Sequence, residues 1–214
     1  MVKRITYLER RHDLTAGQFR EHWATTHAEI AKDLPRVLSY RQNHVVQSES
    51  PSGEDQPFLV DGIVELWFED EAAAGAGFGS EVADRLIEDE KKFMAGLTGV
   101  AMHAGPPTPE HPYKVWLLAM AADESTREQV EGWAAGVGER LGAAIAVDRA
   151  VEGAPILQRE ALRREAELPD YAIVLMCDER DAAQRALTDL GIVASESGLF
   201  RRSQVFLAEE LRII

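Results

Sequence analysis

The feature that most constrains the fold of this 214-residue sequence is an internal repeat. A capping box, which is a Ser or Thr followed three residues later by Glu or Gln, opens a helix at Thr15–Gln18. A shift of 110 residues places this box on a second one at Ser125–Glu128. Because one shift aligns several elements in the same order, two copies of one module explain the sequence better than chance matches do. The same shift pairs Trp23 with Trp133, Ile63-Val64 with Ile173-Val174, and the opening strand with residues 113–118.

The first copy predicts the element order β-α-β-β-α-β, which is the ferredoxin-like layout. Runs of β-branched and aromatic residues indicate the strands, and Pro35 ends the first helix because it disfavours helical geometry at the residue before it. Residues 75–79 are rich in glycine but lack the Gly-Lys-Ser/Thr of a phosphate-binding loop, so we expect a flexible loop there. The expected elements are strands at 2–8, 38–46, 61–68 and 100–103, helices from 15 to 34 and from 81 to 97, and an exposed loop at 48–56.

Two such modules are expected to form one barrel. Each module has one sheet face covered by its own helices, and its other apolar face has to be buried. The predicted fold class is therefore α+β, with tandem ferredoxin-like modules forming an intrachain dimeric α+β barrel. The proline-rich residues 106–112 form an extended linker. We expect a first domain over residues 1–105, which holds the cavity, and a diverged second domain over residues 112–214, which serves mainly as scaffold.

The repeat also indicates where the two copies differ. The second copy carries apolar or small residues where the first carries groups capable of chemistry, so the first is expected to keep the working pocket. The shift of 110 residues places Val137 opposite His27, Leu175 opposite Glu65, and Cys177 opposite Trp67.

Charge and composition narrow the classes of partner. The sequence holds 23 Lys and Arg against 37 Asp and Glu, and its net charge of −14 repels phosphate backbones and anionic lipids, so neither nucleic acid nor membrane is an expected partner. It has no apolar run typical of a signal peptide or a membrane span, so we expect a cytoplasmic protein. Its single cysteine, Cys177, cannot form an intrachain disulfide. We expect no metal site built by the protein, because His22 and His27 are five residues apart and so lie on different helix faces.

His27 lies on an apolar stripe of the first helix, together with Phe19, Trp23 and Ile30. Histidine titrates near neutral pH, so an enclosed imidazole can act as a general acid or base. The alternative is a core histidine whose hydrogen bonds are structural. The charged run at residues 88–92, by contrast, is typical of the solvated side of an amphipathic helix.

Glu65 and Trp67 fall on the strand face opposite to the one that meets the helices, so both should point into the closed barrel. A buried carboxylate either shifts its pKa upward or finds a partner, and Arg41 on the neighbouring strand or His27 could be that partner. Arg41 and Asn43 share a parity and could anchor the polar groups of a ligand. Structural ion pairing and a solvated strand edge are the alternatives.

These residues resemble the EthD family, which is named for ether-degradation gene clusters and belongs to the dimeric α+β barrel superfamily. The resemblance covers roughly residues 2–104, and the second half is similar only in layout. It rests on Leu14-Thr15, on FREHWATTHA at 19–28, on YRQN at 40–43 and on DGIVELWF at 61–68.

The resemblance implies a ligand cavity between sheet and helices. Trp23 and His27 stand at positions that the family pattern marks, with Asn43, Glu65 and Trp67 nearby. Relatives across the superfamily include lactone isomerases, polyketide cyclases and decarboxylases, cofactor-free oxygenases of aromatic polyketides, haem enzymes, and proteins with no assigned activity. Membership of the superfamily therefore limits the possible reactions but does not identify one of them.

The leading hypothesis is an enzyme without a cofactor that acts on a small apolar, aromatic or polyketide-like substrate, as an oxygenase or as a lyase or isomerase. His27 would line a hollow enclosed between the two opposed sheets and would move the proton, and Glu65 or Asn43 would orient the imidazole or the substrate. Trp23 and Trp67 would form an apolar wall. The alternative is a non-catalytic small-molecule-binding or stress-response protein, which a cavity too small for a bicyclic ligand would favour. Haem binding through a histidine is a third hypothesis, and two fused barrels could pair as a homodimer.

Overall fold

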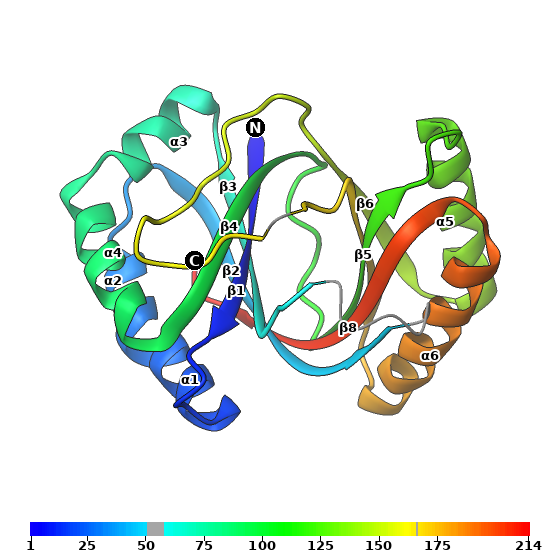
Figure 1. The fold of residues 1–214 in the computed structure, drawn as a ribbon, viewed down its shortest axis with the longest axis horizontal. Coiled ribbons are helices and arrows are strands. Elements are labelled where there is room, and N and C mark those ends of the chain that lie inside the picture. The colour runs from blue at the N-terminus through cyan, green and yellow to red at the C-terminus, as the bar shows by residue number, and fades with distance from the viewer. Residues whose placement is uncertain (51–57, 166) are drawn as a thin grey trace.

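A closed barrel forms the centre of the molecule. The computed structural model describes residues 1–50, 58–165 and 167–214. Within them, eight strands close in the order β1-β3-β2-β8-β5-β7-β6-β4, and every neighbouring pair is antiparallel (Figure 1). The expected closed barrel in a mixed α and β fold is therefore confirmed. The strands are β1 (Val2–Arg10), β2 (Val37–Glu49), β3 (Gly62–Phe68), β4 (Met94–His103), β5 (Tyr113–Ala121), β6 (Ala144–Ala150), β7 (Tyr171–Cys177) and β8 (Phe200–Arg212).

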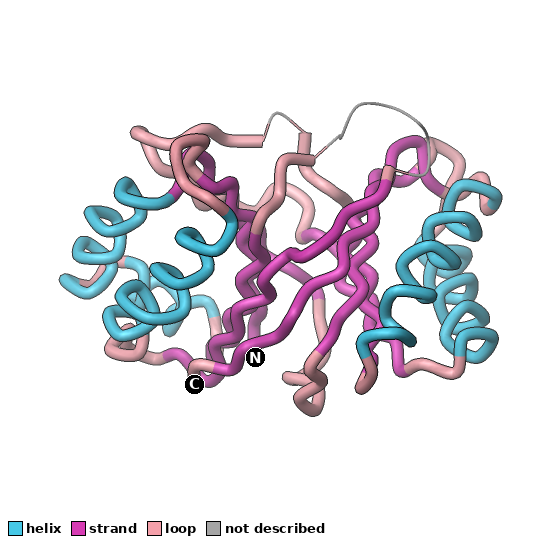
Figure 2. The backbone as a smooth tube through the Cα atoms, turned by 90° about the horizontal axis from the view of Figure 1, so that it is seen from below, coloured by secondary structure: helices cyan, strands magenta, loops and turns pink. Residues whose placement is uncertain are grey.

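Two helical layers cover opposite sides of this barrel (Figure 2). The first half of the chain contributes β4-β1-β3-β2 and the second half contributes β6-β7-β5-β8, so the first and third strands of each half lie at the centre of its sheet. The origin of the halves by duplication stays a prediction. The helical segments are α1 (Ala16–His22), a π-helical turn η1 (Trp23–His27), α2 (Ala28–Ala31), α3 (Glu71–Phe78) and α4 (Glu81–Phe93) on one side, and α5 (Arg127–Leu141) and α6 (Arg180–Glu196) on the other.

The two capping boxes are 111 residues apart, not 110. The Thr15 side chain accepts a hydrogen bond from the Gln18 backbone as expected, and in the second half Thr126 and Gln129 form the box. Ser125 is not the cap of α5, because the helix begins at Arg127 with Thr126 as its N-cap, and the Ser125 hydroxyl instead donates to the Leu199 carbonyl at 2.8 Å. The prediction of a box at Ser125–Glu128 is therefore wrong by one residue.

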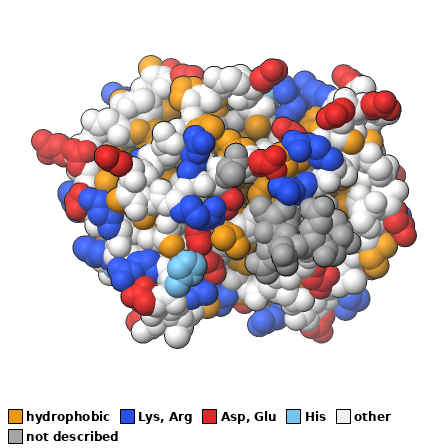
Figure 3. All heavy atoms as spheres, in the orientation of Figure 1, with side chains coloured by type: hydrophobic (Ala, Val, Ile, Leu, Met, Phe, Trp, Pro, Cys, Tyr) orange, Lys and Arg blue, Asp and Glu red, His pale blue; other side chains and the backbone are white. Residues whose placement is uncertain are grey.

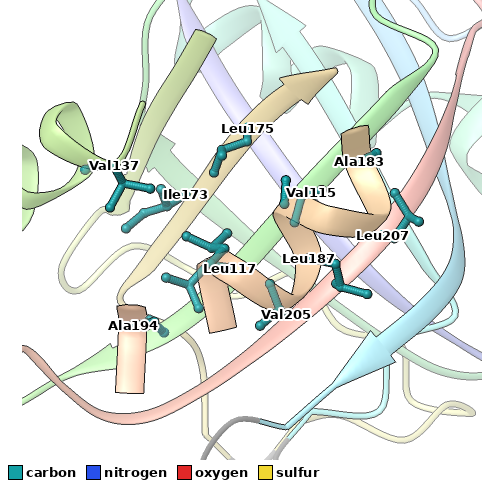
Figure 4. Close-up of a cluster of buried hydrophobic side chains, with 14 of the residues drawn as sticks. Val115, Leu117, Val137, Ile173, Leu175, Ala183, Leu187, Ala194, Val205 and Leu207 are labelled. Atoms are coloured by element: carbon teal, nitrogen blue, oxygen red, sulfur yellow. The ribbon is translucent and has the colours of Figure 1, made fainter. Parts of the chain in front are cut away.

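A single-residue error in the opposite direction affects the strands. Glu65 pairs with Ile5, and the equivalent position in the second half is Val174, which pairs with Trp116. Leu175 and Cys177 instead face α5 and α6, in the aliphatic cluster of Figure 4. The predicted pairing of Glu65 with Leu175 and of Trp67 with Cys177 thus joins residues on opposite sheet faces.

Two local predictions in the first half also change. Residues 75–78 belong to helix α3, not to a flexible loop, because the Asp70 side chain caps its first turn by accepting from Ala73 N at 2.8 Å. Gly77 suits this helix because a Cβ there would lie 3.0 Å from the Phe68 ring. Helix α4 ends at Phe93, and β4 begins at Met94 instead of Val100.

Three hydrophobic clusters hold the molecule together. One lies between the first-half sheet and α1–α4, one lies between the second-half sheet and α5 and α6, and the third fills the barrel. Acidic and basic side chains are interspersed over the face seen in Figure 3. No helix of the described residues is long and apolar enough to cross a membrane. Most of the loop expected at 48–56, residues 51–56, lies outside the described residues.

Candidate functional site

The predicted site residues lie on two opposite faces of the first-half sheet. Trp23 and His27 lie on the helix-covered face, where Trp23 is fully buried in the helix–sheet cluster. Glu65 and Trp67 point into the barrel, as their strand parity predicts. The expectation that the imidazole lines a hollow between the two opposed sheets is therefore wrong, as is the expectation that Glu65 or Asn43 orients it. Successive side chains of a strand point to opposite faces, so β3 separates the two groups.

On the helix side, His27 but not Trp23 lines a small cavity of about 60 Å³. The walls are largely apolar and come from β1–β4, α3, α4 and residues 27–34. Five polar side chains also line the cavity, namely Thr6, His27, Tyr40, Glu90 and Arg159. An imidazole thus meets an apolar hollow that is confined to the first half and one loop of the second.

His27 is held by a carboxylate that the sequence did not single out. Its Nδ1 lies 3.1 Å from Oδ2 of Asp89 on α4, and His22 Nε2 lies 3.1 Å from the same oxygen. In an α-helix residues five apart would lie about 140° from each other. The π-helical turn Trp23–His27 adds one residue to the turn, so His22 and His27 reach the same carboxylate. The prediction that they lie on different faces is wrong for this reason.

Asp89 is ionised and fixes the hydrogen-bonding roles of the imidazole. Burial raises its pKa, but hydrogen bonds from His27, His22 and Lys92 outweigh burial and hold the pKa of Asp89 well below its ordinary range. An ionised carboxylate can only accept hydrogen bonds, so His27 Nδ1 carries a hydrogen and donates a hydrogen bond to Asp89. The neutral imidazole then keeps Nε2 as a proton acceptor.

Tyr40 contributes a second polar group to the cavity. Its hydroxyl oxygen accepts from Trp23 Nε1 at 3.2 Å and from Gln42 Nε2 at 2.9 Å. Burial raises the pKa of Tyr40 to about 12, so the phenol keeps its proton. Because both neighbours donate to the oxygen, the phenol proton is free to be donated elsewhere. Trp23 therefore positions Tyr40, and packs against Gly62 in the core.

A loop of the second half closes the cavity. Residues 151–165, which we call the strap, cross the first half in yellow in Figure 1 and pair with β4 through reciprocal backbone hydrogen bonds of 2.8 Å between Leu157 and Gly99. Arg159 of the strap donates to Glu90 from Nε at 2.6 Å and from Nη2 at 3.1 Å. Leu157 and Arg159 thus form part of the cavity wall. In this closed form the cavity is too small for a bicyclic ligand or a haem.

The second group forms a buried ionic cluster inside the barrel. Glu65 lies between two lysines, with Lys3 Nζ at 2.8 Å and Lys114 Nζ at 2.5 Å, and it accepts from Asn43 Nδ2 at 3.0 Å. Burial opposes its ionisation, but Lys3 and Lys114 outweigh burial and hold the pKa of Glu65 at about 2. Arg41 is not its partner, because its Nη1 pairs with Glu210 at 3.2 Å. Further ion pairs join Lys3 to Asp148 and Lys114 to Glu210.

No cluster of three or more His, Cys, Asp or Glu side chains suited to a metal occurs in the described part of the chain.

Two residues of the site, Asp89 and Tyr40, were not predicted, although the sequence contains an indication of each. Asp89 and Glu90 lie between Leu86 and Phe93 on the apolar stripe of α4 and are 1% and 5% exposed, so the interpretation of residues 88–92 as a solvated face is wrong for these two. Tyr40 shares the strand parity of Gln42, which faces the helices, whereas Arg41 and Asn43 face the barrel.

A comparison with protein families bears on this half of the molecule. The profile of the EthD domain matches residues 11–96, a span that includes His27, Tyr40 and Asp89. Residues 11–96 are an EthD domain. The π-helical turn and the His22–Asp89–His27 contacts lie within this EthD domain, whereas Thr6, Leu8, Leu97 and the strap complete the cavity wall from outside it. No curated protein matches the chain significantly.

Solved structures share the fold over nearly the whole chain. A "putative monooxygenase" from Fusobacterium nucleatum has a TM-score of 0.60 at 7% identity, covering 98% of this chain and 92% of its own. An "anthrone oxidase-like protein" has a TM-score of 0.63 at 8% identity, covering 99% and 93%. A "putative monooxygenase" from Lactobacillus acidophilus has a TM-score of 0.54 at 10% identity, covering 100% and 94%. At these identities the likeness concerns the fold, including its second half.

Proposed function

We propose that the EthD domain is an enzyme that needs no cofactor and that uses His27 as a general base on a small, largely apolar substrate. The observation that carries this proposal is the His27–Asp89 pair at the wall of an apolar cavity. With Asp89 ionised and bonded to Nδ1, Nε2 can take a proton from an acidic C–H or O–H group of a substrate. The carboxylate would then stabilise the imidazolium that results.

Two neighbours of His27 complete the proposed mechanism. The Tyr40 phenol can donate to the oxygen on which substrate charge develops, which stabilises an enolate or phenolate. His22, one quarter exposed, shares Asp89 with His27 and links the buried carboxylate to solvent. His27, Asp89 and His22 can therefore return the proton to water after each turnover.

The substrate class rests on the apolar wall and on the names of the structural neighbours. Two are described as monooxygenases and one as anthrone oxidase-like, which favours an aromatic or polyketide-like substrate whose anion reacts with dioxygen. The alternative reaction is a proton transfer that leads to elimination or isomerisation. Because the closed cavity holds about 60 Å³, either substrate has to displace the strap at Leu157 and Arg159.

The test compares His27→Ala with His12→Ala, because His12 is 87% exposed and does not line the cavity. Anthrone and 1,8-dihydroxyanthrone are supplied in air, and oxygen uptake and products are followed by an electrode and mass spectrometry. We expect His27→Ala to reduce turnover about 10²–10⁴-fold and His12→Ala to leave it unchanged. Equal turnover in a folded His27→Ala variant would rule out the proposed base.

The cavity volume favours a second candidate, a binding protein without catalysis. A hollow of about 60 Å³ fits a few atoms and not a bicyclic ring, which is the outcome expected for this alternative. Saturable binding of anthrone with no product, admitted by displacement of the strap and retained in His27→Ala, would support it.

We also infer that the two halves descend from one duplicated module. Both begin with a strand, followed by a capping box of the same form, and the strand orders within the halves agree. Lys3 and Lys114 are 111 residues apart, as are the capping residues Thr15 and Thr126, and both lysines bind Glu65.

A further inference from the structure

The barrel interior holds a second and larger pocket, on the other side of the sheet from His27. It has a volume of about 410 Å³, which lies within the range of small-molecule sites. Both halves of the chain line it, with Lys3 and Glu65 from the first and Lys114 and Asp148 from the second. The proposed enzyme uses none of these four side chains, so the pocket requires an explanation of its own.

The charges around this pocket balance. Three cations, Lys3, Arg41 and Lys114, meet three anions, Glu65, Asp148 and Glu210, and each cation has at least one anion within ion-pair distance. None of their side chains is more than 5% exposed. A ligand with a net charge would add a charge that this balanced cluster does not compensate, and an uncompensated charge away from water is unfavourable. The pocket is therefore suited to an uncharged ligand.

Two polar groups at the pocket wall keep unused hydrogen-bonding capacity. The Lys3 ammonium has three N–H donors, of which Glu65 and Asp148 take two, and its nitrogen lies 4.6 Å from the centre of the Trp67 ring. Asp148 receives Lys3 on Oδ2, and its Oδ1 has no hydrogen-bond partner among the described residues. Burial raises the pKa of Asp148, against the opposing effect of Lys3, so this carboxyl gains from a further donor. A donor and an acceptor next to each other match a hydroxyl group, which offers both.

The remaining wall is apolar. Val174 and Met176 come from β7, and Pro106 and Pro107 come from the linker between β4 and β5. The linker is fixed across the barrel end, because Arg41 donates to the Thr108 carbonyl and Trp67 Nε1 donates to the Gly105 carbonyl at 3.3 Å. A ligand here would bury an apolar body against these side chains while its polar end meets Lys3 and Asp148.

We propose that this end of the barrel is a second ligand site, which binds an uncharged, largely apolar molecule through a hydroxyl group placed between Lys3 and Asp148. A phenol or a small aromatic alcohol has this chemistry. The site is formed by both halves, whereas the first half and the strap form the cavity of His27. The two sites are therefore separable by mutation.

The test measures the binding of 2-naphthol, 2-naphthoate and phenol by isothermal titration calorimetry. The wild type is expected to bind 2-naphthol, and to bind 2-naphthoate at least about tenfold more weakly because of its charge. Ala146→Phe, which adds a ring at the pocket wall, is expected to abolish binding. Asp148→Asn is expected to weaken it about tenfold by removing the charged acceptor. Each variant is checked for a cooperative thermal transition.

His27→Ala is the matched control, because it alters the other cavity only. It is expected to bind 2-naphthol as the wild type does. Loss of binding in His27→Ala together with unchanged binding in Asp148→Asn would place the ligand on the helix side and overturn the second site. Equal affinity for 2-naphthoate, or no binding of either neutral probe, would also overturn it. None of these outcomes depends on turnover, so the enzyme proposal can fail while the second site stands.

Discussion

The two helical layers differ far more than the two sheets that they cover. In the second half, α5 and α6 pack against the barrel through buried aliphatic and small side chains, with Val137, Ala183 and Leu187 among them (Figure 4). In the first half the same position holds His27, Asp89 and a cavity. The same barrel therefore carries two different helical layers. The layer of α5 and α6, packed through aliphatic and small side chains, is called the solid layer below, and the layer with the buried polar groups and the cavity is called the hollow layer.

The length of the first helix shows how the difference arises. The helical run Ala16–Ala31 is one residue longer than α5, Arg127–Leu141, and the extra residue is taken up by the π-helical turn. Both flanks of the turn can then keep their contacts with the sheet while the turn itself brings His27 to Asp89. Such turns are frequent at functional sites, which fits the assignment of the site to this layer.

Truncation of the solid layer should have the largest effect on stability. Leu187→Ala removes a fully buried side chain of α6, and we expect the free energy of unfolding to fall by about 2–5 kcal/mol. Leu86→Ala on α4 should cost less, because Leu86 already borders the cavity and has fewer contacts to lose. Urea unfolding of both variants measures the difference. Equal losses would contradict the contrast between a solid and a hollow layer.

The second-largest effect concerns a position where the sheets differ, Glu65 against Val174. The pKa of Glu65 is about 2 in the folded protein against 4.5 as its ordinary value, so its contribution to stability is complete above pH 4.5 and is lost as the pH falls towards 2. The size of this contribution is ~3 kcal/mol. In Glu65→Gln, the free energy of unfolding should therefore fall less steeply between pH 4.5 and pH 2 than it does in the wild type.

Urea unfolding at several pH values between 2.5 and 7 measures this slope. Asp89 also loses stabilisation in acid, but it does so in both proteins and cancels in the difference. The exposed Glu152 serves as the control, and Glu152→Gln should keep the slope of the wild type. A slope that survives in Glu65→Gln would show that Lys3 and Lys114 do not stabilise its ionised form.

The architecture could be predicted from the sequence because it depends on local patterns. The capping box at Thr15–Gln18 and the alternation in residues 62–68 are short-range signals, and both are confirmed. The predicted repeat places the second capping box one residue early, since two boxes of similar form overlap at 125–129. Which of the two caps the helix depends on where α5 begins, and the structure has it begin at Arg127.

The site was harder to predict because it depends on which residues meet across elements. His27 is common to the prediction and to the structure, but its partner Asp89 lies 62 residues further along the chain. Nothing in the spacing of His22 and His27 shows that the helix takes a π-helical turn. The strap that closes the cavity comes from the other half and has no regular pattern, so its contribution of Arg159 could not be anticipated.

A smaller effect is expected where the halves exchange a large and a small residue. Gly62 pairs with Leu8 and lies under Trp23, whereas the equivalent pair in the second half is Tyr171 with Ala119. A Cβ on Gly62 would lie 2.5 Å from the Trp23 ring. Gly62→Ala should therefore lower the unfolding free energy by about 1–3 kcal/mol through overpacking. An unchanged transition in urea would mean that the indole can move without loss.

The smallest effect has the opposite sign and belongs to the second half. Gly132 lies on the exposed side of α5, and a Cβ there would have no other atom within 4 Å. Gly132→Ala should raise the unfolding free energy by about 0.5–1 kcal/mol, because alanine loses less backbone entropy in a helix. Gly142→Ala is the matched control at the end of the same helix, where φ of +62° disfavours alanine and the sign should reverse. If Gly132→Ala destabilises the protein instead, α5 carries a constraint on its outer face, and the description of the second layer as support for the barrel alone would have to change.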